Sequence, residues 1–354
     1  MGLDEWRARI DAIDREVLDL LNQRADAAIQ VGQIKQEQGA ECYVPEREHE
    51  LLERLLRLNP GPLPAEAIRA IWREIFSASL TLQRPLRIAY LGPEATFTHQ
   101  AALLGFGALA EYLPARGIHE IFSEVERGRA DCGVVPVENS TEGTVNHTLD
   151  RLIDSDLLIS GEILLEIHHA LLGRAGDLTG VKAVYSHPQA LAQCRGWLAA
   201  ELPDLPTVEV ASTAAAVERA REEPTAAVIA SELAGRFYDL PVLRSRIEDS
   251  PHNVTRFLVV GPRAMGPSGR DKTSVLFSIK DEVGALYRIL EPFAEHAINL
   301  TKIESRPTKR RPWEYVFFVD FEGHRDDPKV QAALTVLRSR CLFLKVLGSY
   351  PAAS

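Results

Sequence analysis

A cluster of small polar side chains follows a strongly apolar stretch in the middle of the chain. The run from Val134 to Val137 has the pattern of a strand, and residues 138–144 are almost all carboxylates, amides and hydroxyls. A helical pattern begins at Val145, so the cluster is expected where a strand end meets a helix N-terminus, whose free N–H groups favour anions. Ser, Thr and Asn are also common in ordinary capping loops. The cluster therefore predicts either such a loop or a site for a small anionic organic ligand.

A second set of polar residues lies in the first 84 residues. Apolar residues repeat at helical spacing in residues 10–34, 51–56 and 68–80, which predicts three helices, the first ending at Gly39 and the second beginning at Pro45. Polar residues interrupt or flank these stripes at Arg24, Lys35, Arg47, Glu48, Ser79 and Gln83. Any one of them alone is more often a solvated surface residue. As a group, the cations, carboxylate, hydroxyl and amide could hold a compact ligand with two carboxylates and a hydroxyl.

Arg7 adds a geometric argument to this set. It precedes Arg24 by 17 residues on the same predicted helix, which is about 25 Å along the helix axis. Two residues so far apart cannot hold one small ligand from the same chain, but an antiparallel partner helix could deliver Arg7. A functional Arg7 therefore requires a dimer, or a higher homo-oligomer, with shared sites.

The pattern changes after a linker at residues 83–86. Short apolar runs at 86–91, 132–137, 157–172, 181–185, 207–210, 226–229 and 256–260 alternate with helical stretches such as 188–202 and 214–221. This order predicts an α/β arrangement with a mostly parallel sheet, in two units around a cleft. A second linker, rich in Gly and Pro, follows at 261–271, and the remainder fits a β-α-β-β-α-β order with ferredoxin-like topology.

Composition limits the classes of function. The chain has 354 residues, of which 45% are hydrophobic and 25% charged, which predicts a soluble protein of two or three domains. There is no apolar run of membrane-spanning length and no secretory signal at the N-terminus. A net charge of −10 argues against nucleic acid as a partner. No metal-ligand spacing and no glycine-rich phosphate loop is found, so neither a metal nor a cofactor is expected. The four scattered cysteines indicate free thiols in a reducing cytoplasm.

Several longer motifs connect these segments to known families. The helical segment resembles the chorismate mutase domain through the seven polar residues above. The middle segment resembles prephenate dehydratase through GPEATFTHQAA (92–102), VVPVENSTEGTVNHT (134–148), SHPQALAQC (186–194) and NVTRFLVVG (253–261). The last segment resembles the ACT regulatory domain through GALY (284–287) and ESRP (304–307). Their order is similar to that of the bifunctional chorismate mutase/prephenate dehydratases of phenylalanine biosynthesis.

This resemblance implies three domains, over residues 1–84, 86–262 and 272–350. They would be an all-α mutase domain, an α/β dehydratase domain with two lobes as in periplasmic binding proteins, and an α+β ferredoxin-like ACT domain. The implied activities convert chorismate to prephenate and prephenate to phenylpyruvate.

The resemblance also implies roles for the polar residues of the mutase site. Arg24, together with Arg7 from the partner chain, would bind the carboxylates of the substrate. Lys35 and Gln83 would bind the ether oxygen and Glu48 the ring hydroxyl, while Arg47 and Ser79 would complete the pocket. Some family members have an Asp where this chain has Val44. Because Gln83 is neutral, mutase activity is expected to vary little between about pH 5 and 8.

For the dehydratase, the resemblance points to Thr255 as the group that assists the departing hydroxyl. Asn139, Ser140 and Thr141 would form the polar wall of the same cleft, and Thr96, Thr98, Ser212 and Thr213 could add hydroxyls or helix caps. The ACT motifs imply inhibition by L-phenylalanine through Gly284, Ala285, Leu286, Glu304, Ser305 and Arg306, at an interface between two such domains.

Two other interpretations remain open from the sequence. One is a non-catalytic amino-acid sensor with a decayed helical arm, and the other is an enzyme with dehydratase activity alone, whose helical segment only dimerises. The joint presence of Arg24, Lys35, Gln83 and Thr255 favours the bifunctional enzyme, whereas Val44 lends some weight to the second alternative.

Overall fold

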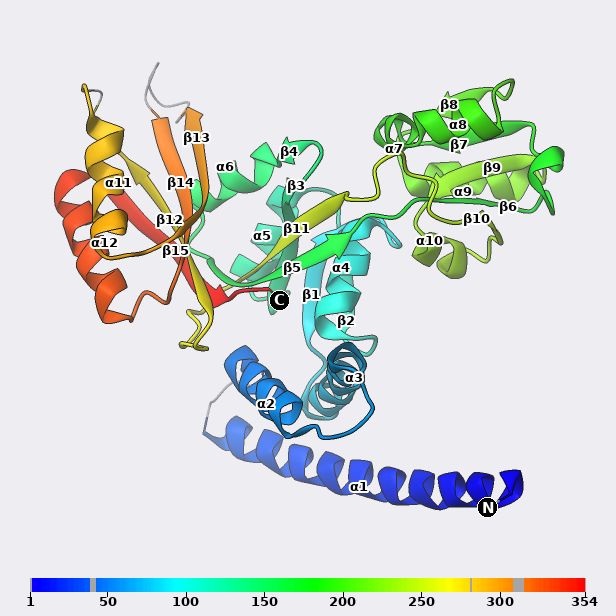
Figure 1. The fold of residues 1–354 in the computed structure, drawn as a ribbon, viewed down its shortest axis with the longest axis horizontal. Coiled ribbons are helices and arrows are strands. Elements are labelled where there is room, and N and C mark those ends of the chain that lie inside the picture. The colour runs from blue at the N-terminus through cyan, green and yellow to red at the C-terminus, as the bar shows by residue number, and fades with distance from the viewer. Residues whose placement is uncertain (1, 39–42, 281, 308–314, 354) are drawn as a thin grey trace. The chain divides into compact units, whose positions relative to one another are not determined.

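The computed structural model describes residues 2–38, 43–280, 282–307 and 315–353 (Figure 1). Its contacts divide the chain into two units, which are described separately. The first holds the residues up to Arg87 together with Phe106–Glu111, and the second holds Ile88–Gly105 and the residues from Tyr112 onward.

The first unit contains the three predicted helices: α1 (Leu3–Glu37), α2 (Pro45–Leu58) and α3 (Ala65–Gln83). The predicted end of the first helix at Gly39 lies outside the described residues. Pro45 occupies the first turn of α2, where its missing N–H and fixed φ suit a helix start. Gly32 is the buried residue of α1, and a Cβ at this position would lie 2.6 Å from Cγ of Gln83. Glycine at position 32 therefore allows α1 to approach the end of α3.

The second unit begins with a first lobe built on a mixed sheet. The strand order is β2-β1-β3-β11-β5, with β4 paired to β3. Strands β1 and β3 run parallel, whereas β11 is antiparallel to both β3 and β5. The bounds are β1 (Arg87–Leu91), α4 (Phe97–Phe106), β2 (Glu111–Ala115), α5 (Ile118–Glu126), β3 (Cys132–Asn139), β4 (Gly143–Thr144), α6 (Asn146–Asp154), β5 (Leu158–Glu166) and β11 (Val254–Gly261).

The second lobe has its own sheet, in the order β10-β6-β9-β7-β8. Strand β7 is parallel to β8 and β9, and β6 is antiparallel to β9 and β10. The elements are β6 (Ala170–Gly173), η1 (Leu178–Gly180), β7 (Ala183–Ser186), α7 (Pro188–Gln193), α8 (Arg195–Glu201), β8 (Thr207–Glu209), α9 (Thr213–Glu222), β9 (Ala226–Ala230), α10 (Glu232–Phe237) and β10 (Val242–Arg244).

The prediction of a mostly parallel sheet is wrong, because the chain crosses between the lobes twice. Strand β5 leaves the first lobe and β11 returns to it as a direct neighbour, so the two strands run in opposite directions. The apolar run at 157–172, predicted as one strand, is divided into β5 and β6 by the first crossing. The helix predicted at 188–202 is likewise two helices that meet at Cys194.

The C-terminal segment confirms the predicted β-α-β-β-α-β order. It contains β12 (Asp271–Ser278), α11 (Ala285–Glu295), β13 (Leu300–Pro307), β14 (Tyr315–Glu322), α12 (Pro328–Arg340) and β15 (Phe343–Pro351). The sheet order is β13-β14-β12-β15, with antiparallel neighbours throughout. One face of the sheet packs on its two helices in a core that includes Phe277, Phe293 and Phe321.

The other face of this sheet packs against the first lobe. Leu276, Phe318 and Tyr350 share a buried core with Ile159 of β5 and Leu258 of β11. Gly348 permits the approach, since a Cβ there would lie 2.1 Å from the carbonyl oxygen of Ile159. The strand that carries Thr255 is therefore in the same packed core as the C-terminal sheet.

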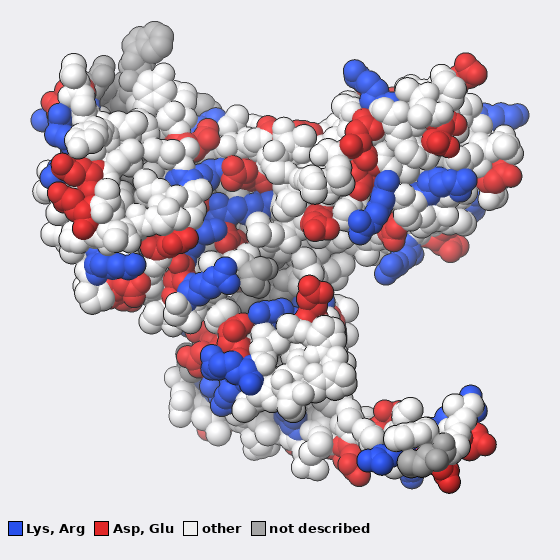
Figure 2. Space-filling model, in the orientation of Figure 1, with Lys and Arg blue, Asp and Glu red and all other residues white. Residues whose placement is uncertain are grey.

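Three of the predicted free thiols fall on described residues. Cys132 and Cys194 are buried and Cys341 is half-buried, all three unpaired, and Cys42 lies outside the described residues. None of the helices in the described ranges combines the length and apolarity that a membrane span requires. Lys and Arg are interspersed with Asp and Glu over the visible face (Figure 2).

Candidate active sites

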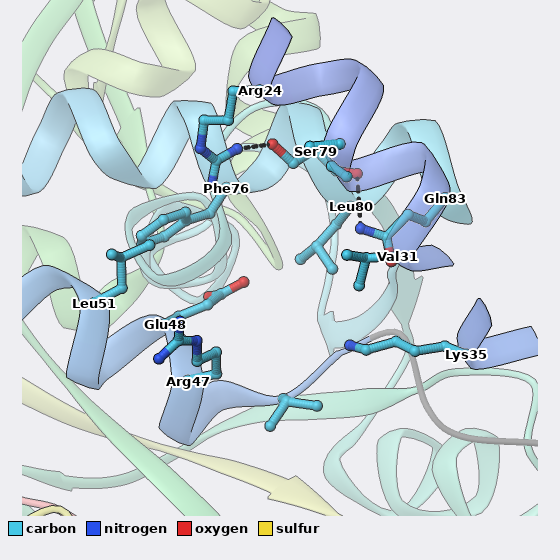
Figure 3. Close-up of a pocket in the computed structure, with 13 residues that line it drawn as sticks. Arg24, Val31, Lys35, Arg47, Glu48, Leu51, Phe76, Ser79, Leu80 and Gln83 are labelled. Atoms are coloured by element: carbon cyan, nitrogen blue, oxygen red, sulfur yellow. Dashed lines mark hydrogen bonds between the residues drawn. The ribbon is translucent and has the colours of Figure 1, made fainter. Parts of the chain in front are cut away.

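Side chains from all three helices of the first unit line a cavity of about 300 Å³, here called the helical pocket (Figure 3). Six of the seven polar residues singled out in the sequence lie in its wall: Arg24 and Lys35 from α1, Arg47 and Glu48 from α2, and Ser79 and Gln83 from α3. The rest of the wall is mainly apolar, with Val31, Val44, Leu51, Phe76 and Leu80 among its residues. The pocket thus combines fixed cations with an apolar surface, as a compact dicarboxylate would require.

Hydrogen bonds orient the polar groups of this pocket. Arg24 donates through Nη1 to Oγ of Ser79, whose hydroxyl donates to the carbonyl of Ile75 at 2.7 Å. The Arg24 guanidinium also lies over the Phe76 ring, 5.6 Å from its centroid. Nε2 of Gln83 lies 3.4 Å from the carbonyl of Ser79, and its buried Oε1 has no hydrogen-bond partner among the described residues. The Gln83 amide is therefore held loosely enough to turn toward a ligand.

Glu48 is the carboxylate of the pocket, and its side chain points into the cavity (Figure 3). Burial raises the pKa of Glu48 to about 7, against the opposing attraction of Arg24 and Lys35. A carboxyl group with this pKa changes its charge within the physiological pH range. The sequence-based expectation of a flat pH profile considered Gln83 alone and did not include this group.

Arg7 does not line the helical pocket of its own chain. Its side chain is 67% exposed and lies 3.6 Å from Asp4. The same half of α1 exposes Trp6, Ile10, Ile13, Val17 and Leu20, at alternating spacings of four and three residues. Such spacing forms one continuous stripe along a helix, of the kind that packs against another helix.

A second cavity, of about 370 Å³, lies between the two lobes and is here called the interlobe cleft. Asn139 at the end of β3 and Thr255 on β11 face each other in the strand register, and both line the cleft. The second lobe contributes Ser186, Gln189 and Gln193, from the end of β7 and from α7. Thr96, Thr98 and Thr213 also line the cleft, as anticipated.

A chain of amides connects the groups of this cleft. Oδ1 of Asn139 accepts from the backbone N–H of Thr141 at 2.9 Å and of Glu142 at 3.0 Å. Its Nδ2 donates to Oγ1 of Thr255 at 2.9 Å and to Oδ1 of Asn253 at 2.6 Å. Because the Thr255 oxygen already accepts from Asn139, its own hydroxyl proton is directed elsewhere and can be donated to a ligand.

Two of the predicted wall residues, Ser140 and Thr141, are not among the residues that line the cleft in this structure. Both are exposed, and the Ser140 hydroxyl instead donates to the carbonyl of His252 and accepts from the N–H of Val254, each at 3.0 Å. The chain turns after Asn139, so these two residues hold the loop against the returning segment. Ser212 is likewise outside the cleft wall and caps α9 through the N–H of Ala215 at 3.2 Å.

Sequence reasoning did not single out three residues of the network, His169, Gln193 and Asn253. Gln193 and Asn253 lie in quoted motifs, where each is one polar residue among several. His169 lies in the connection between β5 and β6, beside His168. His168 contacts Glu166 at 3.1 Å and Glu248 at 2.7 Å, whereas His169 lines the cleft. Only the neighbouring pair of histidines could have drawn attention to this position.

Comparison with known proteins identifies the family. The prephenate dehydratase family model matches residues 88–265, that of type II chorismate mutases matches 6–84, and the ACT domain model matches 273–338. The bifunctional chorismate mutase/prephenate dehydratase of Aquifex aeolicus is 53% identical over 355 residues, covering 99% of this chain and 98% of that protein. The chain belongs to the bifunctional chorismate mutase/prephenate dehydratase family.

Two further relatives agree with this assignment. The bifunctional chorismate mutase/prephenate dehydratase of Pseudomonas aeruginosa is 45% identical over 357 residues, covering 99% of this chain and 98% of that protein. The crystal structure of prephenate dehydratase from Arthrobacter aurescens, in complex with L-Phe, matches with a TM-score of 0.70 and 37% identity, over 76% of this chain and 90% of that one. The fold of the second unit is thus that of a prephenate dehydratase with its ACT domain.

In this family member, the ACT domain contacts the dehydratase domain beside the cleft. Lys302, Glu304 and Arg306 alternate along β13 and therefore share a face of the sheet. Lys302 lies 2.7 Å from Glu138, Glu304 accepts from the Thr144 hydroxyl at 3.1 Å, and Arg306 lies 2.7 Å from Asp150. The partners belong to the segment that carries Asn139.

The other predicted regulatory residues lie away from this contact. Ser305 is exposed on the opposite face of β13. Gly284 precedes α11 with φ of 78°, a left-handed conformation that favours glycine, while Ala285 and Leu286 begin the helix. The ESRP motif thus has two faces, one against the dehydratase domain and one exposed.

A buried ionic cluster makes a second connection to the ACT domain. Arg256, next to Thr255, donates to Glu162 at 2.7 Å, Asp320 at 2.6 Å and the Tyr350 hydroxyl at 2.9 Å. Despite the burial of Glu162, Arg256 and Lys272 hold its pKa below the usual value. The residue after Thr255 is therefore bound directly to the ACT sheet.

Proposed function

We propose that the helical pocket rearranges chorismate to prephenate and that the interlobe cleft converts prephenate to phenylpyruvate, in the cytoplasm and without a cofactor. The observation that carries the first assignment is the convergence of Arg24, Lys35, Glu48 and Gln83 from three helices in one cavity. The second rests on the Asn139–Thr255 hydrogen bond in a separate cleft.

The rearrangement is pericyclic, so the mutase pocket has only to hold the reactive conformer and to stabilise charge on the ether oxygen. Arg24 binds a carboxylate, and Lys35 and Gln83 donate to the ether oxygen. Glu48 accepts from the ring hydroxyl, while Arg47 and Ser79 complete the polar wall. This assignment is supported by the direction in which Lys35 and Glu48 point (Figure 3).

A second chain completes the helical pocket in this proposal. Arg7 is too far along α1 to reach the pocket of its own chain, and the exposed apolar stripe beside it is suited to an antiparallel α1. A homodimer would bury that stripe and bring Arg7 to the partner's Arg24. The position of Arg7 and the exposed apolar stripe therefore both support this antiparallel homodimer.

In the cleft, prephenate loses carbon dioxide and its ring hydroxyl. The electrons of the broken C–C bond form the aromatic ring as the C–O bond breaks, and the leaving oxygen takes up a proton to become water. Thr255 donates a hydrogen bond to that oxygen, while Asn139 holds the Thr255 hydroxyl in position. Such assistance typically contributes about 10²–10⁴-fold to a rate.

L-phenylalanine is proposed to inhibit the dehydratase by binding to the ACT domain near Gly284–Leu286 and the exposed face of β13. A bound effector acts only through a difference in affinity between two states. The contacts of Lys302, Glu304 and Arg306 offer a direct route from β13 to the Asn139 segment. Glu304 and Arg306 are therefore proposed to transmit the signal, and Ser305 to lie at the effector site.

Arg306→Ala should weaken this coupling. We expect the phenylalanine concentration for half-inhibition to rise at least about fivefold, because typical coupling energies correspond to factors of 5–150. Uninhibited dehydratase activity should stay within a few-fold of the wild type. Arg338→Ala, which removes an exposed arginine of α12, is the matched control. Unchanged inhibition in Arg306→Ala would show that the Arg306–Asp150 pair carries no signal.

The ionisation of Glu48 predicts a pH dependence of the mutase. Since burial raises the pKa of Glu48 to about 7, the ionised acceptor is present above pH 7 and is lost as the pH falls. The mutase kcat/KM is therefore expected to fall by up to about tenfold per pH unit below 7. Glu48→Gln should have lower activity and a flat profile between pH 5 and 8.

Gln83→Glu is a control for which we expect the opposite direction of pH dependence. The new carboxyl group can donate to the ether oxygen only when it is protonated, so mutase activity should fall as the pH rises. Wild-type pH dependence in this variant would exclude Gln83 from contact with the ether oxygen.

One assay tests the whole proposal and its alternatives. Purified protein is supplied with chorismate, and both its loss and the appearance of phenylpyruvate are followed, with and without millimolar phenylalanine. A bifunctional enzyme consumes chorismate and forms phenylpyruvate. A dehydratase alone acts only on added prephenate, and an amino-acid sensor acts on neither.

A further inference from the structure

His169 is a buried cleft residue with no role in the proposal above. Only 3% of the residue is exposed, and its ring packs edge-on against Phe97 at a centroid distance of 5.3 Å. Its Nε2 lies 2.7 Å from Oε1 of Gln193, whereas its buried Nδ1 has no partner among the described residues. An unpaired buried nitrogen in a ligand cleft requires an explanation.

The hydrogen bonds of the cleft determine which nitrogen of His169 carries the proton. Two backbone N–H groups orient the Asn139 amide, so its Nδ2 donates to Oδ1 of Asn253. Asn253 in turn donates through Nδ2 to Oε1 of Gln193 at 3.2 Å. Nε2 of Gln193 donates to Glu142 at 2.7 Å. Oε1 of Gln193 is thus an acceptor.

The consequence for His169 is a single tautomer. Because a carbonyl oxygen cannot donate, Nε2 of His169 must carry the proton that it shares with Gln193. Burial also lowers the pKa of His169 below its usual value, so the ring is neutral at pH 7. Nδ1 is therefore a bare acceptor on a ring that lines the interlobe cleft.

Ionised prephenate has one group that can donate to such an acceptor. Its two carboxylates and its ketone only accept, and the ring hydroxyl is its single donor. Phenylpyruvate, the product, has lost that hydroxyl. We propose that Nδ1 of His169 accepts a hydrogen bond from the ring hydroxyl of prephenate, so that the cleft binds the substrate in preference to phenylpyruvate.

This assignment rests on the proposed dehydratase activity of the cleft and adds substrate recognition to it. Thr255 donates a hydrogen bond to the leaving oxygen, and Nδ1 of His169 accepts a hydrogen bond from the same hydroxyl without removing its proton, which orients the hydroxyl from two sides. After the reaction, phenylpyruvate has no group that can donate to this acceptor, and a ligand that leaves a buried polar group unpaired is bound less tightly. His169 therefore promotes product release as well as substrate binding.

Two variants of His169 separate its nitrogen atoms. His169→Gln places an amide near Nε2, which keeps a donor for Gln193 and removes the acceptor. His169→Asn places an amide oxygen near Nδ1, which keeps the acceptor and removes the contact with Gln193. For His169→Gln we expect KM for prephenate to rise on the order of 10- to 100-fold, with a smaller change in kcat. His169→Asn should retain a KM closer to that of the wild type.

The inhibition constant of phenylpyruvate is the second readout. In His169→Gln it should stay constant or fall, because the product makes no use of Nδ1. An equal rise in KM and in the inhibition constant would indicate a merely structural role and overturn the proposal. Mutase activity and inhibition by phenylalanine, measured on the same full-length protein, report whether each variant is folded.

A measurement on the unmutated protein does not depend on folding of a variant. Long-range ¹H–¹⁵N correlation spectra distinguish the two tautomers of a histidine, and His169 should carry its proton on Nε2. A proton on Nδ1 would overturn the proposal. If Thr255→Val and His169→Gln both left phenylpyruvate formation unchanged, the cleft assignment itself would fail. If only His169→Gln left phenylpyruvate formation unchanged, the proposed role of His169 would fail, and the assignment of the cleft as the dehydratase site would stand.

Discussion

Thr255→Val should abolish most of the dehydratase activity and leave the mutase intact. Valine has nearly the same shape as threonine but cannot donate a hydrogen bond to the leaving oxygen, so we expect phenylpyruvate formation to fall by about 10²–10⁴-fold. The variant should still fold, since the Asn139 amide retains its bond to Asn253. Rates with prephenate and with chorismate, measured on one preparation, give both activities.

Thr255→Ser is the matched control for this prediction. It keeps the hydroxyl and loses only a methyl group, so a substantial part of the activity should remain. Full dehydratase activity in Thr255→Val would exclude the hydroxyl from the reaction. A parallel loss of mutase activity would instead indicate that the protein had unfolded.

Arg7→Ala and Arg24→Ala should each abolish the mutase, and a mixture of the two chains should partly restore it. Each variant removes a cation that binds a substrate carboxylate, which we expect to cost on the order of 10²–10³-fold in kcat/KM. In a mixed dimer, one pocket receives both wild-type arginines and the other receives neither. Random pairing of coexpressed chains should therefore restore about one quarter of the wild-type activity.

The mixing experiment separates a shared pocket from a pocket within one chain. If Arg7 served its own chain, neither chain of a mixed dimer would have an intact pocket and no activity would return. Phenylpyruvate formation from added prephenate should be normal in both single variants, because the interlobe cleft uses neither arginine. Sedimentation of Arg7→Ala would show whether the dimer itself persists.

Periodic apolar patterns made the helical unit predictable. The bounds of α2 and α3 follow the spacing of Leu and Ile residues, and Pro45 marks the start of α2. The order of elements in the C-terminal segment was predictable as well, and its last helix, α12, is observed at Pro328–Arg340. These elements depend on contacts within a few residues along the chain, which a sequence pattern records directly.

Strand direction in the two lobes was not predictable in this way. Whether β11 lies parallel or antiparallel to β5 depends on the path of the chain through the second lobe, between residues 170 and 244. Apolar runs of similar composition fit either direction. The expectation of mostly parallel sheets was wrong for this reason.

The sequence by itself determined the family, the three helices of the mutase segment and most of the polar groups that meet in the helical pocket. Only the tertiary structure showed that Ser140 and Thr141 lie outside the cleft, that Glu304 and Arg306 contact the dehydratase domain, and that His169 meets Gln193. Helical periodicity depends on residues that are close together in the chain, so it can be read from the sequence. The direction of a hydrogen bond is set by partners from distant segments, which meet only when the chain has folded.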